Sequence, residues 1–253
     1  MADASHNRSL RMPKGAWLPL GLIALWALVA ISHAVDSPLF VSPMAVLLAP
    51  FADPSGREIW ASVATSIARV LTGGFIGIAL GLLLGTVCGL WSVAAFSLAP
   101  SIHTLRQIAV FGWIPLFTAW FGNGEVTKLV FTALSTFFPV FLATEQGIRA
   151  TPLALKEVAQ TLELPFRSRL IRLYLPAALP SIQIGIQIAA LSAWIGTIGA
   201  EYAIGNGRGL GNYIASARDQ FRMDIVLVGV FVLAAGGVML NRISTSVFAR
   251  LSV

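Results

Sequence analysis

The sequence predicts an all-α, polytopic membrane protein with about six transmembrane helices. Of its 253 residues, 57% are hydrophobic and 11% are charged, and the mean hydropathy is +0.81. A soluble domain of this size is far less apolar. The apolar residues are gathered into runs of about 20, the length that crosses a hydrocarbon core about 30 Å thick. Composition and run length together therefore give the fold class.

Charge and residue usage exclude several other classes of protein. The net charge is +6, but the cations cluster where cytoplasmic loops would lie, so the positive-inside rule explains them better than nucleic-acid binding does. The single cysteine, Cys88, lies in an apolar run and predicts neither a disulfide framework nor a cysteine-based metal site. His6, His33 and His103 share no ligand spacing, so no metal site is expected.

The first predicted span covers residues 16–32 and follows a polar tail, 1–15, that carries three cations against one acid. A secretory signal peptide has a similar outline. The apolar run is long for such a peptide, however, and residues 33–38 offer no small-residue cleavage site. We therefore expect a retained transmembrane helix with the tail on the cytoplasmic side.

Residues 33–60 contain four prolines and a net negative charge, which predicts an outside loop with short helical pieces. The second predicted span, 62–90, carries glycine at every fourth position: 73, 77, 81, 85 and 89. At that spacing the glycines line one face of a helix and let a neighbouring helix approach closely. Helix packing is the interpretation we favour, and a pore-lining stripe is the alternative.

The third and fourth predicted spans are 97–121 and 126–145. Pro100, Arg106 and Pro115 interrupt the third span, so we expect it to be bent or partly shielded from lipid. A charge such as Arg106 near a membrane segment is costly unless it snorkels to the surface or faces a polar cavity.

Between two apolar runs lies the longest charged stretch compatible with helix, within a cytoplasmic loop that we place at 148–175. Thr151 followed by Pro152 predicts a helix start, with the Thr hydroxyl capping free backbone N–H groups. A short helix then follows over about 152–162, with one apolar face made by Leu155, Val158, Ala159 and Leu162. Pro165 breaks the chain, and a second short helix carries Arg167, Arg169 and Arg172. Two such helices form a protrusion to which a soluble partner protein could bind.

The last two predicted spans are 176–200 and 225–240, followed by a cytoplasmic tail at 246–253. Between them, 201–222 is predicted to be an outside loop with glycines that match no nucleotide-binding pattern. With six spans, both tails and the loop from Glu145 to Arg172, which has five cations and three acids, lie on the cytoplasmic side.

The loop resembles the "EAA" loop of permease subunits of ABC importers. That pattern is Glu-Ala-Ala, three residues, Gly, nine residues, Ile, one residue and Leu-Pro. Glu157, Ala159, Leu175 and Pro176 match it in register, while Val158 replaces the middle Ala and Leu173 replaces Ile. Glu163 stands where the family has Gly, and Glu enters a tight turn less easily.

Other segments are similar to the nitrate, sulfonate and taurine branch of these permeases. They are 112–122 (GWIPLFTAWFG), 137–139 (FFP) and 207–211 (GRGLG). The resemblance covers about residues 38–245 and implies the type I ABC importer permease fold in the bacterial inner membrane, surrounded by lipid. It also implies a homodimer on two cytoplasmic ATPase subunits, which bind ATP and Mg, and a periplasmic or lipid-anchored substrate-binding protein. This chain itself would hold no cofactor and would not be an enzyme.

Two sets of site residues are expected, the first from the resemblance and the second from the polar and aromatic residues of the predicted spans. The loop that couples to the ATPase is expected to use Glu157, Val158, Ala159, Leu162, Glu163, Arg167, Arg169, Arg172 and Pro176. A translocation path and its gate are expected to involve Trp113, Trp120, Phe121, Phe138, Gln183, Gln187 and Trp194. Gln183 and Gln187 share a helix face, and amides inside a membrane need partners. Interhelical hydrogen bonds explain the two glutamines as well as substrate contact does, and ordinary packing is the alternative for the aromatic residues.

Within this branch the carried solutes are nitrate, sulfonates, taurine, bicarbonate and small organic compounds. A secondary transporter or channel without an ATPase is the main competing class. Such proteins usually show two similar halves or charges at the bilayer midplane, and the sequence shows no obvious repeat and few central charges. A membrane anchor that recruits a soluble partner would need the loop but no polar face at Gln183 and Gln187.

Overall fold

The computed structural model describes residues 17–32, 37, 39–52 and 54–251, and over these residues every regular element is helical. The predicted all-α class is confirmed, whereas the predicted tail 1–15 lies outside the described residues. The elements are α1 (Trp17–Ile31), α2 (Pro43–Ala52), α3 (Pro54–Leu90), α4 (Ser92–Ser97), α5 (Ala99–Leu105), the 3-10 turn η2 (Val110–Trp113), α6 (Ile114–Phe121), α7 (Glu125–Arg149), α8 (Leu153–Thr161), α9 (Phe166–Arg169), the π-helical turn η3 (Leu170–Tyr174), α10 (Leu175–Ile204), α11 (Leu210–Asp219) and α12 (Met223–Leu251).

Four described helices are long and apolar enough to cross a membrane, and they cover 55–90, 125–149, 166–204 and 223–247. Shorter apolar helices cover Gly21–Ile31, Pro43–Ala52 and Val110–Phe121. The first and third of these overlap the predicted spans 16–32 and 97–121. Both are shorter than the roughly 20 residues of a straight span, so membrane crossing by these two segments stays a prediction.

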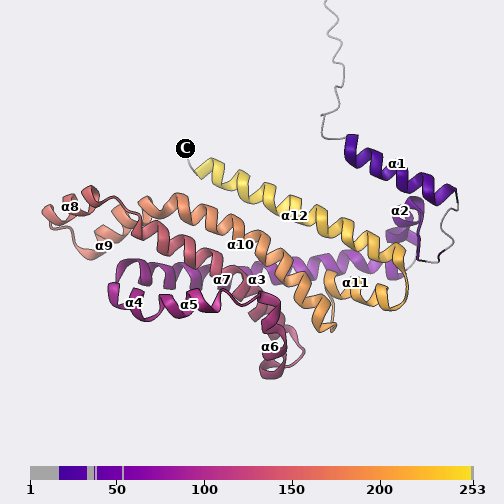
Figure 1. The fold of residues 1–253 in the computed structure, drawn as a ribbon, viewed down its shortest axis with the longest axis horizontal. Coiled ribbons are helices and arrows are strands. Elements are labelled where there is room, and N and C mark those ends of the chain that lie inside the picture. Colours follow the sequence, from indigo (N-terminus) through magenta and orange to yellow (C-terminus); the bar gives the residue numbers. More distant parts are fainter. Residues whose placement is uncertain (1–16, 33–36, 38, 53, 252–253) are drawn as a thin grey trace, which may run out of the picture.

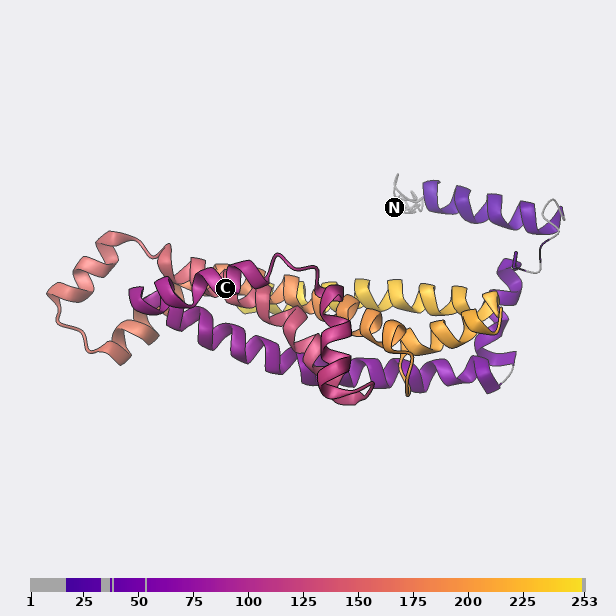
Figure 2. The same cartoon turned by 60° about the horizontal axis from the view of Figure 1, so that its bottom comes forward.

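The long helices α3, α7, α10 and α12 run along one axis and form an elongated bundle (Figures 1 and 2). Helices α8 and α9 lie at one end, which we call the α8 end. Helices α2 and α11 lie at the opposite end, which we call the α11 end.

The glycine stripe of α3 packs against α7, which confirms the packing interpretation. A Cβ on Gly77 would lie 2.2 Å from the carbonyl oxygen of Ala133, and a Cβ on Gly85 would lie 2.8 Å from that of Phe141. A Cβ on Gly73, Gly81 or Gly89 would lie 2.8, 2.9 or 2.9 Å from the nearest atom of α7. The repeat of four residues thus holds two helix backbones together over about four turns.

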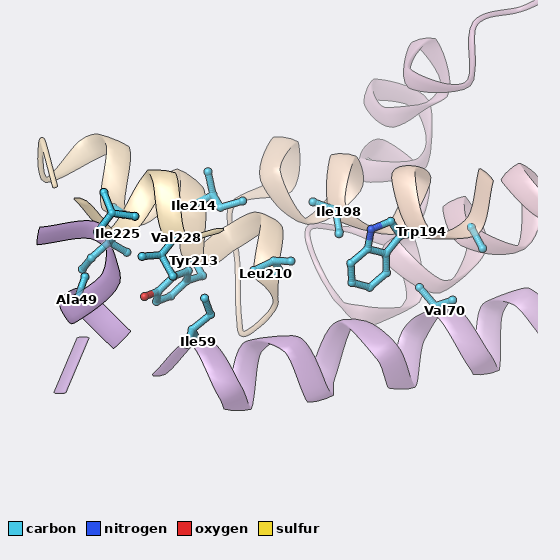
Figure 3. Packing of buried hydrophobic residues seen from close by; sticks show 13 residues of the cluster. Ala49, Ile59, Val70, Trp194, Ile198, Leu210, Tyr213, Ile214, Ile225 and Val228 are labelled. Carbon is cyan, nitrogen blue, oxygen red and sulfur yellow. The ribbon is translucent and has the colours of Figure 1, made fainter. Parts of the chain in front are cut away.

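The main hydrophobic cluster lies toward the α11 end and joins α2, α3, α10, α11 and α12 (Figure 3). Trp194 of α10 is buried within it and donates an Nε1 hydrogen bond to the carbonyl oxygen of Leu233 in α12, at 3.0 Å. A Cβ on Gly236 would lie 2.4 Å from the indole ring, so α12 approaches this ring closely. Helix α1 is attached more loosely, through the Trp26 hydrogen bond to Val41 and its ring contact with Phe231.

The predicted span 97–121 is broken, as its prolines indicate. Pro100 and Pro115 each occupy the first turn of a separate helix, α5 and α6, where a missing N–H costs nothing. Residues 106–109 between them are not helical. Helix α6 leaves the bundle at a steep angle to the long helices (Figures 1 and 2).

The prediction of a loop over 201–222 is wrong for most of that range. Helix α10 continues to Ile204, where Gly205 ends it with a positive φ of 66°. Helix α11 then forms over Leu210–Asp219, because its apolar residues Leu210, Tyr213, Ile214 and Ala217 recur at helical spacing and are buried. The glycines that favoured a loop account only for residues 205–209.

Candidate functional site

The segment that resembles the EAA loop protrudes from the end of the bundle (Figure 1). On α8, Ala159 is buried, but Leu155, Val158 and Leu162 are 46%, 55% and 64% exposed. Glu157 is also exposed. Burial of an amphipathic helix normally covers such an apolar face, so this face is available to another molecule.

The turn after α8 places a non-glycine residue in the left-handed region. Glu163 has φ 48°, its N–H donates to the carbonyl of Gln160, and the N–H of Leu164 donates to that of Ala159. This pair of hydrogen bonds is the Schellman motif, which favours glycine at the position of Glu163. Glu163, which stands where the family pattern has glycine, is therefore a left-handed residue in this chain.

The predicted cap by Thr151 is wrong. Thr151 is buried, and its hydroxyl donates to the carbonyl of Ile148, at 2.8 Å, instead of accepting from an α8 N–H. The residue before α8 is Pro152, and no side chain caps the helix. The Thr hydroxyl thus adds a hydrogen bond to a carbonyl in the last turn of α7 that also accepts from the N–H of Thr151.

The basic helix after Pro165 is continuous with the next membrane helix. Helix α9, η3 and α10 together run without a break over Phe166–Ile204. Arg167 and Arg172 are exposed, and Arg169 is half-buried. The ring of Phe166 stacks on Trp91 at the end of α3, with a centroid distance of 5.5 Å. This segment is therefore continuous with α10 and contacts the end of α3.

A cavity of about 660 Å³ lies between α5 with η2 on one side and α7 with α10 on the other. Its wall is mainly apolar, and its polar side chains are Arg106, Ser135, Gln146, Ser181 and Ser192. Of the described residues that line it, Arg106 alone is charged. Arg106 lines this cavity and is also exposed at the surface of the chain.

The cavity includes one of the predicted path residues, Phe138. Gln183 and Gln187 are half-buried and do not line it. Trp194 follows Gln187 at i+7 and packs on α12, so this face of α10 is turned toward α12. A different face of α10, with Ile184, Ile188 and Ser192, borders the cavity instead.

The other predicted path residues form an aromatic group on η2 and α6. Phe117 is buried at its centre, with ring centroids 5.7 Å from Trp113, 6.5 Å from Trp120 and 6.2 Å from Phe121. Trp120 is 65% exposed. None of the three predicted residues borders the cavity described above. Phe111, which precedes this group, does, and its ring lies against Phe131 of α7.

Four charged residues that the sequence reasoning missed meet near the start of α7. Arg69 of α3 makes two contacts with the carboxylate of Glu125, at 2.6 and 2.7 Å, and one with Glu201 of α10, at 2.6 Å. Lys128 lies 3.6 Å from Glu125. Arg69, Lys128 and Glu201 are each no more than 4% exposed. Two cations and two anions are thus neutralised within one cluster, which we call the charge network, and of the four only Glu125 is exposed.

The charge network also holds the loop between α10 and α11. Arg69 donates to the carbonyl of Arg208, and Lys128 donates to that of Asn206. Glu201 accepts hydrogen bonds from the N–H of Gly211 and from Ser66, whose hydroxyl also accepts from the N–H of Leu210. The signal for this network was Arg69 within an apolar run, since an ionisable residue in such a run usually has a specific partner.

A smaller charged group lies nearer the α8 end. Glu145 of α7 is 2% exposed, and its two oxygens lie 2.8 Å from Nη2 of Arg149 and 2.9 Å from Nε2 of His103. These contacts tie α5 to α7. Among the described residues no three His, Cys, Asp or Glu side chains gather as a metal site would require.

Comparison with known proteins identifies the family. Residues 77–253 match the family model described as binding-protein-dependent transport system inner membrane component. The chain is 34% identical over 224 residues to the putative aliphatic sulfonates transport permease protein SsuC of Bacillus subtilis, covering 88% of this chain and 81% of that protein. It is 31% identical over 243 residues to the taurine transport system permease protein TauC of Escherichia coli, with 90% and 88% covered. It is 29% identical over 232 residues to the bicarbonate transport system permease protein CmpB of Synechococcus elongatus, with 88% and 83% covered.

The matched region begins within α3 and contains the cavity, the exposed α8 and the continuous helix that follows it. The curated relatives match over more than four-fifths of their own length. The chain therefore belongs to the family of binding-protein-dependent inner membrane transport components, the multi-pass permease subunits of ABC importers, which work with an ATPase and a substrate-binding protein and are not enzymes.

Proposed function

We propose that two copies of this chain form the membrane path of an importer for a small anion, driven by two ATPase subunits that dock on α8. Each copy contributes one docking segment, and ATP and Mg are bound by the ATPase subunits. The N- and C-termini and the α8 end are cytoplasmic in this arrangement, in keeping with the cations around residues 149–172. The α11 end then faces the substrate-binding protein.

The exposed surface of α8 is the observation that carries this proposal. Leu155, Val158 and Leu162 offer apolar side chains to a groove of the ATPase, and Glu157 adds a charge beside them. An apolar centre with a polar rim is the usual composition of a protein interface. Arg167, Arg169 and Arg172, together with Pro176 where the segment enters α10, complete the proposed coupling segment.

Movement of the docked α8 would be transmitted through the continuous helix 166–204. Closure of the two ATPase subunits would displace the coupling segments, and α10 would then move against α7 and α5. A packed bundle with two alternative arrangements responds to such a displacement by switching between them. The cavity between these helices would in this way open to one side of the membrane and then to the other.

The proposed path follows the cavity, with Phe138 on its wall and the aromatic group of Trp113, Trp120 and Phe121 as a gate beside it. The printed names of the relatives concern aliphatic sulfonates, taurine and bicarbonate. All three contain an anionic group, and this shared chemistry supports a small anion as the solute here. Pairing of two copies would cover the side of the cavity that a single chain leaves open, and two-fold pairing is the commonest closed assembly.

The test is the Glu157→Lys substitution in the purified complex with its ATPase, reconstituted in liposomes. Reversal of charge at the docking surface should release the ATPase or abolish transport while the permease stays folded, because docking of two proteins depends on complementary charges across the interface. Gln160→Lys, an exposed change on the same helix, is the matched control for added positive charge. Normal ATPase binding and transport by Glu157→Lys would show that this residue does not make the contact.

A further inference from the structure

A second cavity, of about 350 Å³, lies where the C-terminal half of α3 meets α9, η3 and the start of α10. Its wall is apolar apart from the hydroxyl of Thr86 and the indole N–H of Trp91. It includes Val87 of α3, Leu170 of η3 and Leu175 of α10. Such a wall suits a hydrocarbon chain, whereas a polar solute would find almost no hydrogen-bond partners there.

An exposed apolar face of α3 continues from this cavity. Leu83 lines the cavity and is 59% exposed. Leu80 and Ile76 precede it by three and seven positions, on the same helix face, and are exposed as well. They belong to a helix that is long and apolar enough to cross a membrane. The cavity is therefore continuous with a surface suited to the hydrocarbon of a bilayer.

Two aromatic side chains lie at the end of the cavity nearest the α8 end. Trp91 and Phe166 both line it, stack on each other with ring centroids 5.5 Å apart, and are exposed in part. Partly exposed tryptophan is typical of the boundary between hydrocarbon and water. This end of the cavity is thus suited to the level of the lipid head groups.

The charges beside these aromatic residues are positive. Residues 166–175 contain three arginines and no acid, and none of the three forms an ion pair with a described residue. Arg169 is half-buried, and its Nε is enclosed without a hydrogen-bond partner among the described residues. Arg169 directly precedes the lining residue Leu170 and follows Phe166 by three positions, on the same helix face. The positive-inside rule accounts for the number of cations, but an enclosed N–H without a partner points to a ligand that this chain does not supply.

We propose that this joint binds one anionic phospholipid, with an acyl chain in the cavity between α3 and α10 and the phosphate on Arg169. Hydrogen bonds from a guanidinium to a phosphate are stronger than those between neutral groups, and arginines at the edge of a bilayer attract anionic head groups. Pairing of two copies through this face would bring the same arginines together, because a two-fold contact uses one patch on both subunits. The site is separate from the solute cavity and from the exposed apolar face of α8.

The test counts the lipids bound to the purified full-length chain by native mass spectrometry in detergent. The chain is titrated with dioleoylphosphatidylglycerol and, separately, with dioleoylphosphatidylcholine. The first lipid is anionic and the second is zwitterionic, and their acyl chains are identical, so the difference in affinity comes from the head group. The parent protein should bind one phosphatidylglycerol about fivefold more tightly than phosphatidylcholine.

The head-group contact is tested by Arg169→Gln. This substitution should weaken phosphatidylglycerol binding about tenfold, the loss expected for one charge-assisted hydrogen bond. Phosphatidylcholine binding should change by less than about twofold, because the acyl chains are the same. Arg218→Gln removes an exposed arginine at the α11 end and is the matched control. Phosphatidylglycerol binding that is unchanged by Arg169→Gln, or equally weakened by Arg218→Gln, would overturn the proposal.

The acyl-chain contact is tested by Val87→Phe, whose larger ring would fill part of the cavity. This substitution should weaken the binding of both lipids, whereas Leu80→Phe, on the exposed face outside the cavity, should not. Lipid counts that are unaffected by Val87→Phe would overturn the proposal, as would loss of a dimer at unchanged lipid counts, which would assign the face to a second copy. Displacement of the lipid by inorganic phosphate at equal concentration would also overturn it.

The substitutions of Arg169 and Val87 act on different parts of the lipid, so either one is a sufficient test if the other variant does not fold. Neither measurement includes the ATPase or a transported solute. A failed Glu157→Lys test would therefore refute the proposed coupling without affecting the lipid site.

Discussion

The guanidinium Nη1 of Arg69 lies 2.6 Å from Oε1 of Glu201, and both side chains are withdrawn from solvent, with exposures of 5% and 0%. This contact joins the middle of α3 to the end of α10. The same guanidinium binds Glu125 at the start of α7 and the backbone of Arg208. One side chain therefore connects three long helices and the loop that leads to α11.

The first prediction is that Glu201→Gln destabilises the protein more than Glu125→Gln does. Loss of one member of a buried ion pair costs about 3–5 kcal/mol. Glu125 has a side chain that is 57% exposed, so water can replace part of its interaction and the expected loss is about 1 kcal/mol. Unfolding of the purified chain by SDS titration measures both values. Equal losses, or a larger loss for Glu125→Gln, would mean that burial does not determine the strength of these contacts.

The second prediction concerns the α3–α7 contact. Gly77→Ala should destabilise the bundle by about 1–3 kcal/mol, because its Cβ would lie 2.0 Å from the Thr136 hydroxyl and 2.2 Å from a backbone carbonyl. Gly74→Ala is the matched control, since its Cβ would meet only a methyl group, at 3.9 Å. The control should be neutral or slightly stabilising. Thermal unfolding in detergent compares the two, and equal stabilities would contradict the close packing of these helices.

The third prediction is that Glu163→Gly stabilises the turn after α8. A left-handed conformation costs a non-glycine residue about 1–2 kcal/mol, and glycine avoids this cost. Part of the gain is offset because glycine also has more conformational freedom in the unfolded chain. We expect a net gain of about 0.5–1 kcal/mol in the free energy of unfolding of this segment, measured by amide hydrogen exchange over 153–164. Leu162→Gly, at a neighbouring position with φ −80°, should instead lower protection. A Glu163→Gly variant with lower protection would show that the glutamate side chain stabilises the turn.

The fourth prediction distinguishes the two faces of α10. Gln187→Leu should leave transport nearly unchanged, because Gln187 lies on the face turned toward α12, and loss of an interhelical hydrogen bond in a membrane costs only about 0.6 kcal/mol on average. Ser192→Phe should reduce transport strongly, because the larger ring would fill part of the cavity. Transport assays in liposomes, with melting temperatures measured on the same samples, provide the comparison. Reduced transport by Gln187→Leu at unchanged stability would show that the solute passes along the face of α10 that carries the glutamines.

The sequence by itself was sufficient for the features that depend on local composition and spacing. Hydropathy predicted a membrane protein, because a helix that crosses lipid must be long and apolar regardless of which helices it packs against. The glycine repeat of α3 gave the packing face, since four-residue spacing places side chains on one side of a helix in any context. The register from Glu157 to Pro176 gave the family and the position of the turn at Glu163, although the amino acid there differs from the family pattern.

The tertiary structure alone decided which partners these side chains have. Arg69 and Glu201 are 132 residues apart, and no local pattern pairs them. The Thr151 hydroxyl donates back to α7 because the chain direction at the end of that helix places the carbonyl of Ile148 within its reach. Arg106 lines the cavity because α5 and η2 lie against α7 and α10. Such choices depend on how distant helices pack, and the free energy of that packing is shared among many residues that the sequence does not bring together.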